Sequence, residues 1–169
     1  HVPTVGRRMA DLADAALDAA LLVARAAVGP QSDDVALAVI AMGKTGACEL
    51  NYISDVDVVY VVGPAQEPSE ADELSEEYLV DVGTRLATEL AHVISATAPE
   101  PPLWPLDTAL RPEGKDGALV RTLDSYLAYY RRWAASWEFQ ALLKARACAG
   151  DSELGARYEQ GVSPLVWEA

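Results

Sequence analysis

The stretch VALAVIAMGKTGACELNYISDVDVVYVV occupies residues 35–62 and contains two apolar runs separated by a polar loop. Residues 35–42 are all apolar, and residues 56–62 are interrupted only by Asp57, a pattern typical of strands buried on both faces. Residues 43–55 are rich in glycine, asparagine and serine, which predicts a turn and a loop. We therefore expect two central strands joined by a loop that ends at Asp55.

Two aspartates stand at the start of the second run, Asp55 and Asp57. Residues i and i+2 of a strand point to the same face, so we expect the two carboxylates to converge. Like charges held together are unfavourable without a cation, and Mg²⁺ prefers carboxylate oxygen. Asp107, in a later expected strand, is a candidate third ligand. Solvated aspartates at a strand edge are the alternative for the pair, and a surface position is the alternative for Asp107.

The turn after the first run has the sequence Gly43-Lys44-Thr45-Gly46. A buried strand that turns on glycine offers backbone N–H groups that can approach a phosphate closely. The turn is not a Walker A loop, because that motif needs glycine at position 38 and Ala38 stands there.

Helices are predicted on both sides of the central stretch. Thr4 can cap a helix that ends at about Val28, before Gly29-Pro30. Residues 69–72, with the sequence Ser-Glu-Ala-Asp, resemble a capping box that opens a helix to about Ser95. The remaining expected elements are a strand near residues 103–110 and helices at residues 123–134, at residues 136–149 and after Asp151. This order predicts an α+β fold.

The composition fits one domain of 169 residues with a core. The net charge of −13 argues against broad electrostatic binding to nucleic acid. Most of the excess lies in residues 1–100, where 17 carboxylates face 5 basic residues. The two cysteines lack a CxxC spacing, which favours a reducing compartment, and we expect the cytoplasm. The sequence has no run of about 18 apolar residues for a membrane span.

Three motifs in order carry a resemblance to a known family. They are residues 43–57 with Ser54-Asp55-x-Asp57, residues 110–117 with the sequence Leu-Arg-Pro-Glu-Gly-Lys-Asp-Gly, and residues 129–146 with Trp137-Glu138. The glycine turn and the three aspartates resemble nucleotidyltransferases of the polymerase-beta type. Over roughly residues 35–165 the chain looks like the glutamine synthetase adenylyltransferase/adenylyl-removing enzyme family, in its actinobacterial form. The resemblance implies a polymerase-beta-like nucleotidyltransferase fold, with a short mixed sheet flanked by helices and a C-terminal helical segment.

The resemblance also implies a set of site residues. Asp55, Asp57 and Asp107 would bind Mg²⁺ ions that clamp the phosphorus centre during in-line displacement. Gly43 and Lys44 would cradle phosphate, and Ser54 would donate a hydrogen bond at the loop. Arg111 and Lys115 would neutralise the phosphates, with salt bridges to surface carboxylates as their alternative role.

Residues further along the third motif are given more distant roles. We expect Lys144 and Arg146 to reach the site from a second layer. Trp133, Trp137 and Tyr130 are expected in the core rather than as a stacking platform for adenine. The chain also departs from the family pattern, with Cys48 where Arg is common and Thr108-Ala109 where many relatives have a second Arg.

In the family, one long chain carries two such domains. One attaches AMP to a tyrosine of glutamine synthetase, and the other removes it by phosphorolysis and releases ADP. Glu-Leu-Asn before the Ser-Asp-x-Asp motif is typical of the removing domain, whereas Glu-Leu-Gly is typical of the attaching domain. Asn51 therefore favours Mg²⁺-dependent removal. ATP-dependent attachment is the alternative, and a non-catalytic regulatory or docking module of the same fold is a second one.

The resemblance implies that the chain is a single nucleotidyltransferase domain from a longer chain with two catalytic domains. Residues 1–130 would form the sheet-containing core, and residues 131–169 a helical extension. Glutamine synthetase would be the protein substrate, and phosphate, ADP, ATP or AMP the ligands. A PII signal protein would act through the full-length chain, and neither nucleic acid nor a membrane is an expected partner.

Overall fold

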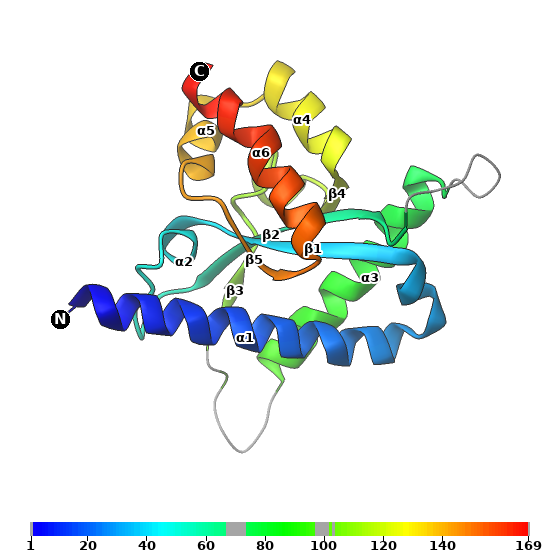
Figure 1. Ribbon diagram of the computed structural model, residues 1–169, viewed down its shortest axis with the longest axis horizontal. Helices are drawn as coiled ribbons and strands as arrows, with labels where there is room; N and C mark the ends of the chain where they lie inside the picture. Colours follow the sequence, from blue (N-terminus) through cyan, green and yellow to red (C-terminus); the bar gives the residue numbers. More distant parts are fainter. Residues whose placement is uncertain (1, 67–73, 97–101, 103, 169) are drawn as a thin grey trace.

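A mixed sheet lies at the centre of the computed structural model, which describes residues 2–66, 74–96, 102 and 104–168 (Figure 1). Strands β1 (Val35–Ala41) and β2 (Val56–Pro64) pair antiparallel, with Val39 opposite Tyr60. Every residue of β1 is buried, as the apolar run predicts. On its other side β1 pairs antiparallel with β5 (Arg146–Gly150), and β2 pairs in parallel with the short strands β3 (Leu106–Asp107) and β4 (Val120–Thr122).

Helices cover both faces of the sheet, as Figure 1 shows. Helices α1 (Val2–Val28) and α3 (Glu76–Ser95) pack on one face against alternate residues of the central strands, such as Val39 and Tyr60. The other residues of these strands, such as Ile40 and Val59, face a second core. That core is closed by α4 (Leu123–Arg132), α5 (Ser136–Leu142) and α6 (Ser152–Glu168). The fold is thus the mixed arrangement of helices and a small sheet that the sequence predicts.

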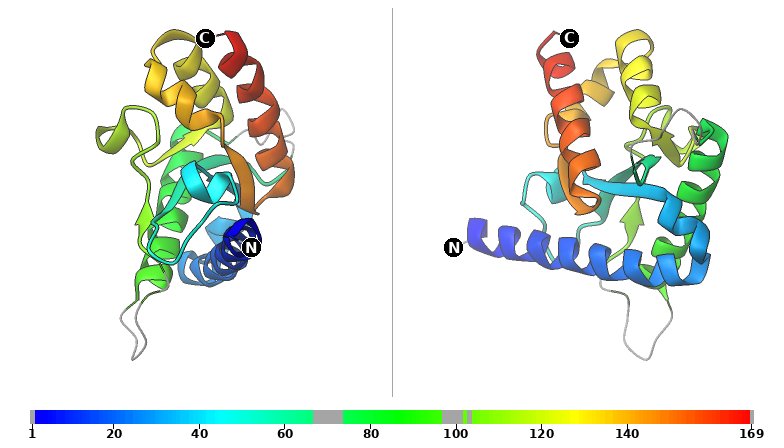
Figure 2. Two further views of the ribbon diagram at one scale, coloured as in Figure 1. Left: turned by 90° about the vertical axis from the view of Figure 1, so that its left-hand side faces the viewer. Right: turned by 45° about the vertical axis from the view of Figure 1, so that its right-hand side comes forward.

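Short helical segments occupy the connections. A 3₁₀ helix, η1 (Pro30–Asp34), links α1 to β1, and a single turn, α2 (Gly43–Gly46), follows β1. A second 3₁₀ helix, η2 (Gly114–Asp116), lies in the loop after β3. The side view in Figure 2 shows this loop projecting from the body of the molecule.

The helix predicted for residues 136–149 is wrong in its second half. Helix α5 ends at Leu142, and Arg146–Gly150 forms strand β5. The reason lies in β1, whose second edge needs hydrogen-bond partners, because a buried strand cannot leave its backbone groups unpaired. The small residues of β5 fit against that edge.

Other element boundaries also differ from the predictions. Helix α1 begins at Val2, so Thr4 lies inside it. Helix α3 begins at Glu76, where the Ser75 side chain accepts a hydrogen bond from the Tyr78 amide, and the expected capping box at residues 69–72 lies outside the described residues. Within the described residues, the strand expected near 103–110 is limited to β3, and strand β4 was not expected.

Two tryptophans expected in the core are exposed. Trp133 is 67% exposed and Trp137 is 45% exposed, whereas Tyr130 is buried as predicted. Both tryptophans lie at the junction of α4 and α5, where the chain turns at the surface before α6 completes the second core. No helix in the described part of the chain is long and apolar enough to cross a membrane.

Candidate active site

Asp57 and Asp107 lie side by side at the end of the sheet. The parallel pairing of β2 and β3 places Val56 opposite Leu106 and Asp57 opposite Asp107. The amide of Val56 donates to the Pro105 carbonyl at 2.9 Å, which anchors the same pairing. Because paired residues of neighbouring strands share a face, two carboxylates meet where the strands begin. Along β2, Asp57 continues the row of Val59 and so belongs to the face that α4, α5 and α6 cover.

The environment of Asp57 disfavours its negative charge. Burial raises the pKa of its carboxyl above the ordinary value, and the charges of Asp107 and Asp55 raise it further, while Lys44 lowers it. A cation between the carboxylates would relieve this repulsion. The site is therefore electrostatically suited to a positively charged ligand.

The glycine turn after β1 packs directly against Asp57. Gly43 has φ +51°, and a Cβ atom there would lie 2.5 Å from Asp57 Oδ2. The Met42 amide donates to the Asp57 carbonyl at 2.8 Å. Only glycine lets the turn approach the carboxylate this closely. Lys44, next in the turn, is exposed and is the basic side chain that lowers the pKa of Asp57.

The loop before Asp57 is organised by Asn51. Its Oδ1 accepts hydrogen bonds from Ser54 Oγ at 2.7 Å and from the Ile53 amide at 3.1 Å. The hydroxyl of Ser54 therefore donates within the loop. Asp55 is exposed and lies just outside β2, and its charge contributes to the raised pKa of Asp57.

The carboxylates of the site are chemically suited to a hard cation, but they do not form a complete set of ligands around one. Two carboxylates with the charge repulsion described above are suitable ligands for Mg²⁺. Across the described ranges, however, no three His, Cys, Asp or Glu side chains stand close enough together to hold a metal ion. Asp57 and Asp107 would thus hold the ion first, and Asp55 would have to turn toward them.

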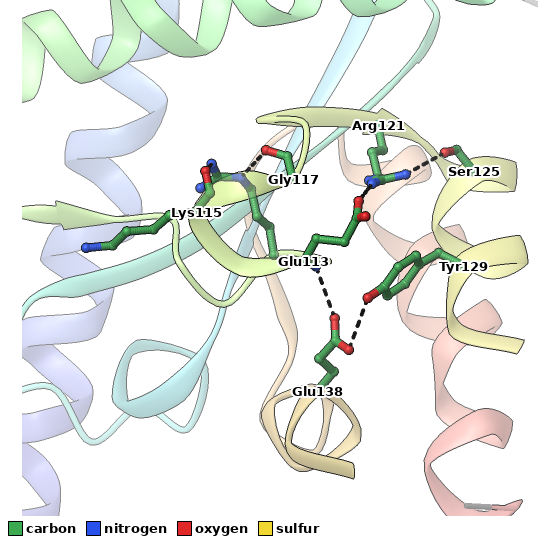
Figure 3. A network of polar contacts seen from close by, with 8 residues as sticks. Glu113, Lys115, Gly117, Arg121, Ser125, Tyr129 and Glu138 are labelled. Atoms are coloured by element: carbon green, nitrogen blue, oxygen red, sulfur yellow. Dashed lines mark hydrogen bonds and ion pairs between the residues drawn. The ribbon is translucent and has the colours of Figure 1, made fainter. Parts of the chain in front are cut away.

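The loop after Asp107 is held from within by Arg111. Its guanidinium donates to the Thr108 carbonyl and hydroxyl, to the Lys115 carbonyl and to the Gly117 carbonyl, at 2.8–3.0 Å. Arg111 is only 9% exposed, so most of its donors are used by the loop itself. The Lys115 side chain is exposed and extends away from the other labelled residues in Figure 3. Of the two basic residues of this loop that were predicted to neutralise phosphate, Lys115 is the exposed one.

A buried carboxylate of the third motif, to which the sequence assigned no role in the site, connects this loop to α5. Glu138 is 3% exposed and accepts hydrogen bonds from the Ala135 amide at 2.7 Å, the Tyr129 hydroxyl at 3.2 Å and the Glu113 amide at 3.4 Å (Figure 3). Glu113 in turn pairs with Arg121 at 2.6 Å. A glutamate in the first turn of a predicted helix was the available signal, because such a side chain can reach back to the N-terminal amides.

Lys144 and Arg146, the residues expected to reach the site from a second layer, are held by other partners. Lys144 pairs with Glu49 at 3.3 Å on the surface. Arg146 pairs with Asp14 of α1 and contacts the carbonyls of the glycine turn. Both residues therefore contact the loop that follows β1.

A small mixed sheet, helices on both faces and paired carboxylates beside a glycine turn define a nucleotidyltransferase-like domain. The family model described as glutamate-ammonia ligase adenylyltransferase matches residues 1–161. The chain belongs to this family.

Curated relatives from actinobacteria support the same assignment. The chain is 53% identical over 161 residues to a bifunctional glutamine synthetase adenylyltransferase/adenylyl-removing enzyme of Streptomyces avermitilis. The matched region covers 95% of this chain and 16% of the relative. Proteins of the same name from Nocardia farcinica and Bifidobacterium longum are 55% and 50% identical, over 98% and 99% of this chain and 15% of each relative. The chain thus spans about one sixth of the length of these relatives.

Proposed function

We propose that this chain is a nucleotidyltransferase domain that removes AMP from an adenylylated tyrosine of glutamine synthetase by Mg²⁺-dependent phosphorolysis. An oxygen of inorganic phosphate attacks the phosphorus of the AMP group, and the bond from phosphorus to the tyrosyl oxygen breaks. The products are ADP and the tyrosine, whose oxygen takes up a proton. The names of the relatives supply the protein substrate.

The observation that carries the proposal is the pairing of Asp57 with Asp107 against the Gly43 turn. When bound between such carboxylates, Mg²⁺ stabilises the charge of a phosphoryl group during in-line displacement. The protein's own part is to hold Asp57 and Asp107 side by side, with Asp55 nearby. Lys44 and Lys115 are exposed cations within the turn and the loop that flank this pair, suited to neutralise the attacking phosphate and the AMP phosphate.

Asn51 favours removal over attachment. The resemblance associates Glu-Leu-Asn with the removing domain, and here the Asn51 side chain holds Ser54 and Ile53 in the loop before Asp55. A glycine at this position would make neither hydrogen bond. The side chain that marks the removing domain therefore shapes the loop next to the carboxylates.

The decisive experiment supplies both reactions to the same protein. The chain is incubated with adenylylated glutamine synthetase, Mg²⁺ and inorganic phosphate, and ADP is measured by chromatography. In parallel it receives unmodified glutamine synthetase, Mg²⁺ and ATP, and pyrophosphate is measured. We expect ADP to form, to require both phosphate and Mg²⁺, and to fall at least 100-fold in Asp57→Asn, since this substitution keeps the shape and removes a carboxylate.

Other outcomes would assign the chain differently. Pyrophosphate from ATP without ADP from the adenylylated protein would favour the attachment reaction. Neither product, together with calorimetry in which Mg²⁺ binds no more tightly to the wild-type chain than to Asp57→Asn, would favour a non-catalytic docking module.

A further inference from the structure

Arg146 joins three parts of the fold that meet behind the candidate site. It is the first residue of β5, where it pairs with Ala41 at the end of β1. Its two terminal nitrogens pair with the two carboxylate oxygens of Asp14 on α1, at 2.7 and 3.1 Å. The same guanidinium donates to the Gly46 carbonyl at 3.3 Å and to the Thr45 carbonyl at 3.2 Å. One side chain thus connects α1, β5 and the glycine turn.

The carbonyls that Arg146 contacts belong to a short turn whose Thr45 and Gly46 are buried. Helix α2 contains only residues Gly43–Gly46, so the carbonyls at its end cannot all be satisfied within it. The turn is also pressed against the chain that leads into β5, since a Cβ at Gly46 would lie 1.9 Å from the Lys144 carbonyl. The Thr45 carbonyl also accepts from the Cys48 amide at 3.2 Å, and Arg146 adds the side-chain link from this turn to α1.

Movement of this turn would displace the carboxylate of Asp57. Gly43, at the other end of the turn, contacts Asp57 Oδ2 so closely that no Cβ fits between them. The turn is internally bonded, from the Gly46 amide to the Met42 carbonyl and from the Ala47 amide to the Gly43 carbonyl, so its two ends move together. A shift of the Gly46 carbonyl is then transmitted to the carboxylate of Asp57.

We propose that Arg146 is a positioning residue, oriented by Asp14, that fixes the Gly43–Gly46 turn against Asp57 and so sets the geometry of the carboxylate pair. The proposal rests on the proposed function in taking Asp57 as part of the reacting site. It also assigns α1 a part in the site, because Asp14 is the group that directs the guanidinium fork. A lysine would keep the charge but could not serve Asp14 and two carbonyls with one planar group.

The structure offers a matched control on the same helix and strand. Asp18 lies one helical turn after Asp14, and its Oδ1 accepts a hydrogen bond from the Gly150 amide at 2.8 Å. Both aspartates therefore tie α1 to β5, but only Asp14 reaches the glycine turn, through Arg146. Asp18→Ala tests what is lost when α1 is loosened from β5 without disturbing that link.

The experiment compares Arg146→Lys, Asp14→Ala and Asp18→Ala in three measurements. Hydrogen exchange reports the amides of Gly46 and Ala47, calorimetry gives the affinity for Mg²⁺, and the removal reaction gives kcat and the KM for phosphate. We expect Arg146→Lys and Asp14→Ala to speed exchange of both amides, to weaken Mg²⁺ binding and to lower kcat by about 10–100-fold, the effect of displacing a reacting group by up to about 1 Å. Asp18→Ala should lower the melting temperature similarly and leave all three readouts near wild type.

Two results would overturn the proposal. Wild-type exchange and Mg²⁺ affinity in Arg146→Lys would show that the turn does not depend on the guanidinium. Equal losses in Asp18→Ala would show a general effect of α1 on stability instead of positioning. If the wild-type protein releases no ADP, the proposed function fails, whereas exchange and Mg²⁺ affinity still test the role of Arg146.

Discussion

Asp57 links the electrostatics of the site to the stability of the fold. Burial raises the pKa of its carboxyl, as do Asp107 and Asp55, from the ordinary value of 3.8. A carboxyl whose pKa is higher in the folded state stabilises the fold fully below its unfolded pKa, and this contribution is lost as pH rises through the folded pKa. At neutral pH without metal, ionised Asp57 is therefore destabilising.

Asp57→Asn should accordingly melt above the wild type at pH 7 in EDTA, by about 2 °C, a shift that corresponds to less than 1 kcal/mol in a domain of this size. The difference should disappear near pH 3, where the wild-type carboxyl is protonated in both states. Thermal melts followed by circular dichroism across this range give the comparison. Asp11→Asn, on the exposed side of α1, controls for the change in net charge. A wild type that melts higher at pH 7 would contradict the expectation.

Substitutions at Gly43 and Gly29 can distinguish the effect of backbone strain from the effect of contact with the site. Both have positive φ, +51° and +87°, but a Cβ at Gly43 meets Asp57 Oδ2 at 2.5 Å, whereas one at Gly29 meets nothing within 4 Å. Alanine at either position should cost about 1 kcal/mol in the free energy of unfolding, because alanine resists positive φ. Only Gly43→Ala should also lower ADP release, by at least 10-fold. Similar activity in the two variants would separate the turn from the reaction.

Among the elements, the loop after Asp107 and helix α5 depend on one buried carboxylate. Glu138→Ala leaves the Ala135 amide, the Tyr129 hydroxyl and the Glu113 amide without their acceptor. We expect a loss of about 2–3 kcal/mol in the free energy of unfolding, measured by urea denaturation, because unpaired buried donors keep their desolvation cost. Glu113→Gln breaks an ion pair whose glutamate is 55% exposed, and should cost less than about 1 kcal/mol. Equal losses would mean that Glu138 stabilises no more than a surface ion pair does.

The central strands were predictable because their burial requires an unbroken apolar run. Val35–Ala41 is buried on both faces, so the sequence itself carries the signal. Strand β5 carries no such signal. Its residues Ala147, Cys148 and Ala149 are small, and they form a strand because the free edge of β1 binds them. Pairing with a distant strand is tertiary information that local periodicity does not contain.

The residues of the candidate site likewise include some that local sequence predicts and others that depend on tertiary structure. Spacing along β2 predicted that Asp55 and Asp57 would converge, and the charge of Asp55 raises the pKa of Asp57; the strand register adds Asp107 opposite Asp57. The family resemblance brought Asp107 into the set, and the parallel register of β2 and β3 explains its place. Arg111 was expected at a phosphate, and the structure directs its guanidinium into its own loop. Side-chain direction of this kind depends on loop conformation, which residue type alone does not determine.

At the scale of the whole molecule, an added cation can stabilise the chain in two ways: by screening the net charge of −13, or by binding to the carboxylate pair. Diffuse repulsion among surface carboxylates is screened by any salt, with a Debye length of about 10 Å at 0.1 M ionic strength. The close pair of Asp57 and Asp107 instead favours a divalent ion held by oxygen. Comparing Mg²⁺ with Na⁺ at equal ionic strength therefore distinguishes screening of the surface charge from binding at the carboxylate pair.

MgCl₂ should raise the melting temperature of the chain more than NaCl of matched ionic strength does. A ligand that binds only the folded state at ten times its Kd stabilises it by about 1.4 kcal/mol, or roughly 3–6 °C in a domain of this size. The excess over NaCl should vanish in both Asp57→Asn and Asp107→Asn, since each removes one member of the pair, while the NaCl response stays close to wild type. Differential scanning calorimetry of the three proteins measures this. An excess that persists in both variants would place the Mg²⁺ effect on other carboxylates and remove the physical basis for a metal at the β2–β3 pairing.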